Sequence, residues 1–201
     1  FNKLGLKFFH IGILLLAAAP SISFFLLTAS AIVGSFKRKD NYFNDKYNFP
    51  FILASILMII NCSLITIKAN LIHNQDSSLA WIGLLNWIPF FWCFWSFQIY
   101  LKNGILRIQA AKYFLIGSIP VLFSGFTQYF LGWYGPYEIF NKLIIWYQRP
   151  LLEGAGVTGL FNNYNYYGAW LSIVLALIIG LFFKRSNNKT QKLITLFFIL
   201  A

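Results

Sequence analysis

The chain has 201 residues, of which 59% are apolar and only 10% are charged. Soluble domains carry about 25% charged residues, so this composition excludes an ordinary soluble domain and predicts an integral membrane protein. Sixteen basic and five acidic residues give a net charge of +11. The basic residues lie between apolar runs, where cytoplasmic loops and anionic lipid head groups account for them. We therefore expect the lipid bilayer, and no nucleic acid, as a partner.

Both ends of the sequence resemble interruptions of a longer protein. The chain begins at Phe1, and it stops at Ala201 inside an apolar run shorter than the roughly 20 residues of a spanning helix. Cys62 and Cys93 lie in apolar runs without His or Cys neighbours at metal-ligand spacing. We expect both to be small buried hydrophobes, and the sequence calls for no metal and no cofactor.

Six apolar segments follow one another along the chain, at residues 8–36, 49–67, 79–101, 113–131, 166–183 and 193–201. They predict an all-α fold, a polytopic bundle of transmembrane helices in a single membrane domain covering residues 1–201. The first segment is too long for one upright helix and too short for two full ones. Pro20 near its centre predicts two short helices that fold back, with one kinked and tilted helix as the alternative.

Loop charge predicts the orientation in the membrane. The loops 37–48, 102–112 and 184–192 are basic, whereas 68–78 and 132–165 carry few cations. The positive-inside rule places the first three in the cytoplasm and the last two outside. Lys3 and Lys7 before an apolar run also imitate a signal peptide, but Pro20 and the continuing apolar run favour a retained segment.

The external loop 132–165 is the only long one. Apolar and polar residues between Ile139 and Gln148 predict a short helix lying in the membrane interface, ended by Pro150. Trp and Tyr residues gather in the same loop, as in an aromatic belt at a membrane surface. The predicted fold is therefore a helix bundle with one long external loop.

Gly, Thr and Asn residues crowd at the end of this loop, where an apolar helix begins. A helix N-terminus binds anions through free backbone N–H groups, and an arginine adds a forked cationic donor. These features predict an anion site at the membrane surface. Its candidate residues are Arg149, Glu153, Thr158, Gly159, Asn162, Asn163 and Asn165.

Each of these residues also has a simpler interpretation. The asparagines would serve only as turn and N-cap residues. Arg149 would snorkel or pair with Glu153. Glu153 would be a solvated carboxylate instead of a catalytic base. The polar groups within the spans are neutral amides, which are ordinary hydrogen-bond partners between helices: Asn61, Asn86, Gln98 and Gln128. Ion-coupled carriers usually bury ionisable residues in their spans, so these amides do not favour a carrier.

At this stretch the sequence resembles a known family. Arg149-Pro150, then Val157-Thr158-Gly159-Leu160-Phe161-Asn162-Asn163-Tyr164-Asn165-Tyr166, then Gly168-Ala169-Trp170-Leu171, is similar to the signature of the O-antigen ligase and polymerase superfamily, and most similar to its cyanobacterial members. Tyr164 stands where that family usually has a proline. The resemblance is specific over residues 145–172 and general elsewhere.

The resemblance implies a metal-independent enzyme in the bacterial inner membrane. It would transfer a glycan from an undecaprenyl-diphosphate-linked donor to a sugar hydroxyl on a glycan or lipid-core acceptor, at the outer face. Arg149 would stabilise the diphosphate leaving group, and the general base would come from a later external loop. The alternatives are a transporter or transport accessory for a small anion such as bicarbonate, and a membrane scaffold.

Overall fold

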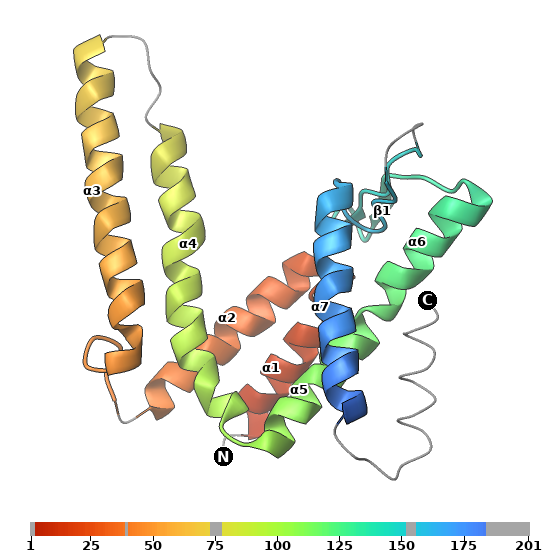
Figure 1. The fold of residues 1–201 in the computed structure, drawn as a ribbon, viewed down its shortest axis with the longest axis horizontal. Coiled ribbons are helices and arrows are strands. Elements are labelled where there is room, and N and C mark those ends of the chain that lie inside the picture. Colours follow the sequence, from red (N-terminus) through yellow and green to blue (C-terminus); the bar gives the residue numbers. More distant parts are fainter. Residues whose placement is uncertain (1–2, 39, 73–77, 152–155, 184–201) are drawn as a thin grey trace. The chain divides into compact units, whose positions relative to one another are not determined.

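The computed structural model describes residues 3–38, 40–72, 78–151 and 156–183 (Figure 1). This part of the chain is mostly helical, and five of its helices are long and apolar enough to cross a membrane. It forms two compact units. One contains the chain up to Ala29 and from Leu101 onward, and the other is Ser30–Tyr100. The chain is thus consistent with a multi-pass membrane protein, and the all-α prediction needs one correction, a small two-stranded sheet.

The first apolar segment is broken into two helices, α1 (Lys3–Leu15) and α2 (Pro20–Lys37). Pro20 opens α2, where its missing N–H is not needed. The chain then doubles back, so that α2 starts beside α1. The Ser23 hydroxyl donates to the carbonyl of Gly12 at 2.7 Å and links the two helices. The prediction of two short helices at Pro20 is confirmed, and the single kinked helix was wrong.

A second break divides α5 (Gly104–Gly117) from α6 (Ile119–Leu131). Asn103 caps α5 by accepting from the Leu106 N–H at 2.9 Å, so this helix begins well before the expected apolar segment. The expected loop 102–112 is therefore mostly helical. Its basic residues Arg107 and Lys112 lie on the first turns of α5 instead of in a loop.

The two breaks lie against each other in the first unit. α1 packs along α5, with the His10 ring stacked on Tyr113 at 4.5 Å between centroids. At Gly117 the backbone of Leu14 comes so close that there is no room for a Cβ atom. Ala17 packs with Val121 in one buried cluster. This contact fixes the relative position of the α1–α2 turn and the α5–α6 break.

Gly117→Ala should destabilise the protein, because the new methyl group meets the Leu14 carbonyl, which is backbone and cannot rotate away. We expect a loss of about 1–3 kcal/mol, as for other overpacked sites. Gly180→Ala is the matched control, since a Cβ there meets nothing within 4 Å. Thermal unfolding followed by tryptophan fluorescence should show a lower midpoint only for Gly117→Ala. Equal midpoints would contradict the close packing of the two breaks.

The second unit contains a pair of long apolar helices, α3 (Phe49–Ile72) and α4 (Ser78–Phe97). Short 3-10 helices precede and follow them, η1 (Lys46–Asn48) and η2 (Gln98–Leu101). The Trp81 indole N–H donates to the Thr66 hydroxyl at 2.9 Å and thereby ties the two helices together. Cys62 is buried, as expected, whereas Cys93 is only half-buried, and both are free thiols.

The last described helix, α7 (Tyr164–Phe183), begins close to the predicted start of its apolar segment. Its inner face forms a buried core with α5 and α6, made by Leu115, Leu122, Val174 and Ile178. The Trp170 indole N–H donates to the Ser118 hydroxyl at 2.9 Å, at the α5–α6 break. α7 therefore packs against α5 and α6, and it holds the end of the preceding loop beside them.

The prediction of a short helix between Ile139 and Gln148 was wrong. Two strands occupy the region, β1 (Tyr137–Ile139) and β2 (Ile144–Trp146), paired antiparallel with Tyr137 opposite Trp146. The connecting residues 140–142 all have positive φ, between 51° and 70°. A right-handed helix cannot pass through three such residues, and the β-branched Ile144 and Ile145 favour a strand.

Candidate functional site

A buried amide, Gln128 of α6, holds the loop that leads into α7. Its Oε1 accepts from the N–H groups of Thr158 and Gly159, each at 2.9 Å. Its Nε2 donates to the carbonyl of Arg149 at 2.6 Å and to the Thr158 hydroxyl at 3.2 Å. Gln128 is 1% exposed and makes all four hydrogen bonds that a carboxamide offers. It fastens both ends of the stretch 149–159 to the helix.

A second buried amide, Gln148, fixes the preceding residues. Its Nε2 donates to the carbonyls of Ser124 and Trp133, at 3.0 and 3.1 Å, and approaches the Thr127 hydroxyl at 3.3 Å. The backbone carbonyl of Gln148 accepts from the Gly135 N–H at 2.6 Å. The two glutamines together replace the hydrogen bonds that loop backbone would otherwise make to water.

Arg149 is placed by its backbone and not by its side chain. Its N–H donates to the Thr158 hydroxyl at 3.0 Å, and its carbonyl accepts from Gln128. The residue is exposed, and within the described ranges no carboxylate pairs with its guanidinium. The backbone of Arg149 is therefore anchored, and its guanidinium is exposed and unpaired among the described residues, where it could meet an anion.

The other predicted site residues divide into supporting and exposed ones. Asn163 caps α7, because its side-chain oxygen accepts from the Asn165 N–H at 2.8 Å. Asn162 and Asn165 are exposed. Glu153 lies outside the described residues. The asparagine that starts the helix is thus Asn163, and the N–H groups of Thr158 and Gly159 are engaged by Gln128 instead of being free for a ligand.

Gly159 is required by both its conformation and its surroundings. Its φ is +55°, a conformation that side chains disfavour. A Cβ there would also lie 2.5 Å from the Tyr167 ring, which itself packs onto Gly125 of α6. The Thr158-Gly159 pair is consequently a tight turn between loop and helix, packed against α6.

An open pocket of about 680 Å³ lies between α6 and the hairpin. We call it the aromatic pocket. Its walls carry Phe123, Trp133, Tyr137 and Trp146, and polar groups come from Ser124, Thr127, Glu138 and Gln148. The Trp146 indole N–H donates to the carbonyl of Ala18 at 2.8 Å, so this wall is held by the α1–α2 turn. Pockets of this size hold small-molecule ligands.

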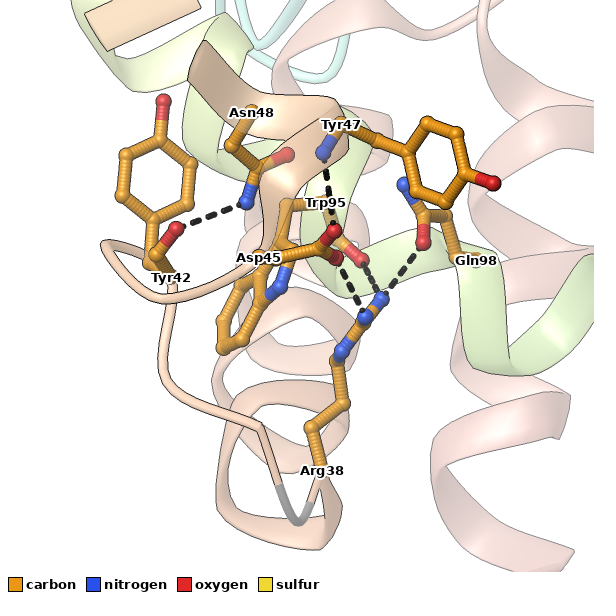
Figure 2. A network of polar contacts seen from close by, with 7 residues as sticks. All are labelled: Arg38, Tyr42, Asp45, Tyr47, Asn48, Trp95 and Gln98. Atoms are coloured by element: carbon orange, nitrogen blue, oxygen red, sulfur yellow. Dashed lines mark hydrogen bonds and ion pairs between the residues drawn. The ribbon is translucent and has the colours of Figure 1, made fainter.

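The second unit contains a separate polar cluster around Arg38, at the end of α2 (Figure 2). The guanidinium pairs with Asp45 at 2.9 Å, and it donates to the Trp95 carbonyl at 2.8 Å and to Gln98 at 2.7 Å. It also lies 4.7 Å from the centroid of the Trp95 ring. A cation there satisfies a carbonyl at the C-terminal end of α4 and matches the helix dipole.

This cluster orders the loop between α2 and α3. Asp45 accepts from the Tyr47 N–H at 3.1 Å, and the Asn48 amide donates to the Tyr42 carbonyl at 2.9 Å, as Figure 2 shows. Burial raises the pKa of the Tyr42 phenol above its ordinary value. Arg38 was counted as one cation of a basic loop, but its charge is used within the protein.

Sequence reasoning found the stretch 149–165 and missed what surrounds it. Gln128 was visible only as a neutral amide within an apolar span, and nothing in its neighbours indicated a loop partner. The hairpin and the aromatic pocket depend on pairings across the loop. Among the described residues, no three His, Cys, Asp or Glu side chains gather as a metal site would require.

No protein-family model matches the chain, and no curated protein or solved structure is found to be similar to it.

Proposed function

We propose that this chain is part of a glycan ligase or polymerase of the membrane surface, one that uses an undecaprenyl-diphosphate-linked donor. The observation that carries the proposal is the placement of Arg149. Its backbone is fixed by Gln128 and Thr158, while its side chain is exposed and unpaired among the described residues. An arginine with an anchored backbone and an exposed guanidinium fits the recognition of a diphosphate. The resemblance of residues 145–172 to the O-antigen ligase and polymerase superfamily supports the same chemistry.

The proposed reaction is a displacement at the sugar carbon that carries the diphosphate. An acceptor hydroxyl forms the new C–O bond, the bond to the diphosphate breaks, and the lipid diphosphate leaves with the electron pair. The hydroxyl proton passes to a general base, which we assign to a later external loop, as the resemblance implies. Arg149 stabilises the negative charge that develops on the leaving group.

In this proposal the anion is bound by a side chain, and not by free backbone N–H groups at the start of a helix. Thr158 and Gly159 donate to Gln128, and Asn163 caps α7. These residues hold the loop, and the anion contact falls to Arg149. Glu153 keeps its place as a candidate base only by its position in the sequence.

The alternative, a carrier or transport accessory for a small anion, has one observation in its favour. Transporters often bind substrate where helices are broken, and two breaks meet in the first unit. The Ala18 carbonyl at the first break already accepts from the Trp146 indole N–H, and the Ser118 hydroxyl at the second accepts from the Trp170 indole N–H. At Gly117 the two breaks leave no room for a methyl group. This packing favours a structural role for the breaks.

The experiment that separates the two functions uses the full-length protein in sealed vesicles. Glycan transfer from lipid-linked donor to acceptor and uptake of labelled bicarbonate are measured on the same preparation. Transfer without uptake supports the ligase or polymerase. Uptake without transfer would establish the carrier in its place.

The proposal also requires the loop 132–165 to face outward. Phe43→Cys and Tyr134→Cys place thiols at exposed positions, 71% and 60% accessible, in the loops expected inside and outside. With Cys62 and Cys93 replaced by alanine, an impermeant maleimide applied to intact cells should label only the cysteine at position 134. Labelling of position 43 alone would reverse the orientation and remove the proposed site from the outer face.

A further inference from the structure

We propose that the aromatic pocket binds a neutral sugar ring, and that it does so beside the anion-binding Arg149. The inference rests on the proposed function, because it names the part of the substrate that lies next to the diphosphate. Gln148 lines the pocket, and Arg149 is the next residue of the chain. In a sugar diphosphate the neutral ring is likewise joined directly to the anion, so neighbouring sites for the two parts would suit it.

The walls of the pocket suit the apolar face of a ring. Tyr137 and Trp146 are direct partners across the hairpin, so both rings stand on the same face of the small sheet. The backbone of Trp133 is held at both ends. Its backbone N–H donates to the Thr127 carbonyl at 3.2 Å, and its backbone carbonyl accepts from the Gln148 side chain. Rigid aromatic side chains supply contact area at little entropic cost. They can stack on the C–H face of a pyranose.

The polar groups of the pocket distinguish a sugar from a lipid chain. Glu138 offers a carboxylate that is 46% exposed, and carboxylates accept strong hydrogen bonds from hydroxyl groups. The Ser124 hydroxyl lies near the pocket but is buried, so it offers nothing to a bound ligand. A hydrocarbon chain would cover the Glu138 carboxylate without donating to it, whereas the hydroxyl groups of a sugar ring can donate to it.

The charge of the pocket disfavours the diphosphate itself. Among the described residues that line it, Glu138 is the only charged side chain. Lys142, 3.7 Å from that carboxylate, is 71% exposed and lies outside the lining. An anion placed there would meet a negative charge, so we expect the pocket to prefer neutral over phosphorylated sugars.

The test is direct binding, measured without any transfer reaction. The full-length protein in lipid nanodiscs is examined by saturation-transfer NMR with the methyl pyranosides of glucose, galactose, mannose and N-acetylglucosamine. At least one should bind saturably, and its ring C–H protons should receive the strongest transfer. Trp133→Leu should weaken that binding at least tenfold, while Trp87→Leu, which removes a similarly exposed tryptophan from α4, should leave it unchanged.

Glu138→Gln tests the charge argument. Glucose 1-phosphate should bind more weakly than methyl glucoside to the native protein, and this difference should shrink in Glu138→Gln. Farnesol serves as the apolar probe. Saturable binding of farnesol that Trp133→Leu abolishes, with no pyranoside bound, would overturn the sugar assignment and make this a lipid-chain pocket.

The outcomes separate this inference from the proposed function. Sugar binding in a protein without glycan transfer would leave the pocket standing and remove the reaction. Transfer that needs Arg149 but is indifferent to Trp133→Leu and to every pyranoside would leave the reaction standing and remove the pocket assignment.

Discussion

Gln128→Ala should release the stretch 149–159 from α6. The substitution leaves two buried N–H groups and one carbonyl without partners, and each such group costs about 1–3 kcal/mol. We expect a loss of at least about 3 kcal/mol, a large share of the few kcal/mol that stabilise a typical domain. The amide hydrogens of Thr158 and Gly159 should then exchange more than a hundredfold faster with deuterium, read by mass spectrometry on the protein in nanodiscs.

The matched control is Gln109→Ala, which removes an exposed amide from the neighbouring helix α5. It should leave both the exchange of Thr158 and the thermal midpoint unchanged. If Gln128→Ala behaved like this control, the loop would be held by its remaining backbone bond from the Tyr147 N–H to the Leu160 carbonyl. The amide would then be a passive neighbour.

Arg149→Ala should remove glycan transfer while the protein stays folded. The loss of one preorganised cationic donor costs about 10²–10³-fold in rate. Stability should not change, because the exposed guanidinium contacts no partner among the described residues and the backbone bonds of residue 149 survive the substitution. Transfer is measured from lipid-linked donor in membranes with matched protein levels, with thermal unfolding on the same variants.

Two further variants define what Arg149 contributes. Arg149→Lys should restore transfer only in part, since lysine keeps the charge but loses the two-pronged donor geometry. Lys142→Ala removes an exposed cation from the same loop and should leave transfer near its native level. Full activity in Arg149→Ala would contradict the diphosphate role and move the search for an anion site to another part of the protein.

Gln128, which looks like an ordinary amide from the sequence, holds the loop, whereas the Arg149 side chain takes no part in holding it among the described residues. An arginine beside a proline draws attention in any loop, whereas a glutamine in an apolar span is ordinary. The structure makes the glutamine the fastening point and leaves the arginine's side chain free. The partner of a neutral amide is decided by the segment that folds over it, and that segment lies 21 to 31 residues further along the chain.

The sequence by itself determined the features that depend on neighbouring residues. Apolar runs of spanning length, the break before Pro20 and an asparagine cap at the start of α7 are local properties, and the structure contains all three. It did not determine the start of α5. There Asn103 caps the helix ahead of the apolar run, and the basic residues counted as a loop belong to the helix.

Only the tertiary structure decided the conformation between Ile139 and Gln148 and the use of Arg38. The apolar and polar residues of that loop fit a surface helix as well as a hairpin, and pairing of Tyr137 with Trp146 selects the hairpin. Arg38 was one basic residue among several until Asp45 and the Trp95 carbonyl were placed beside it. The physical reason is common to both. Hydropathy and charge patterns fix which segments enter the membrane, whereas hydrogen bonds and ion pairs depend on atoms that the chain brings together only by folding.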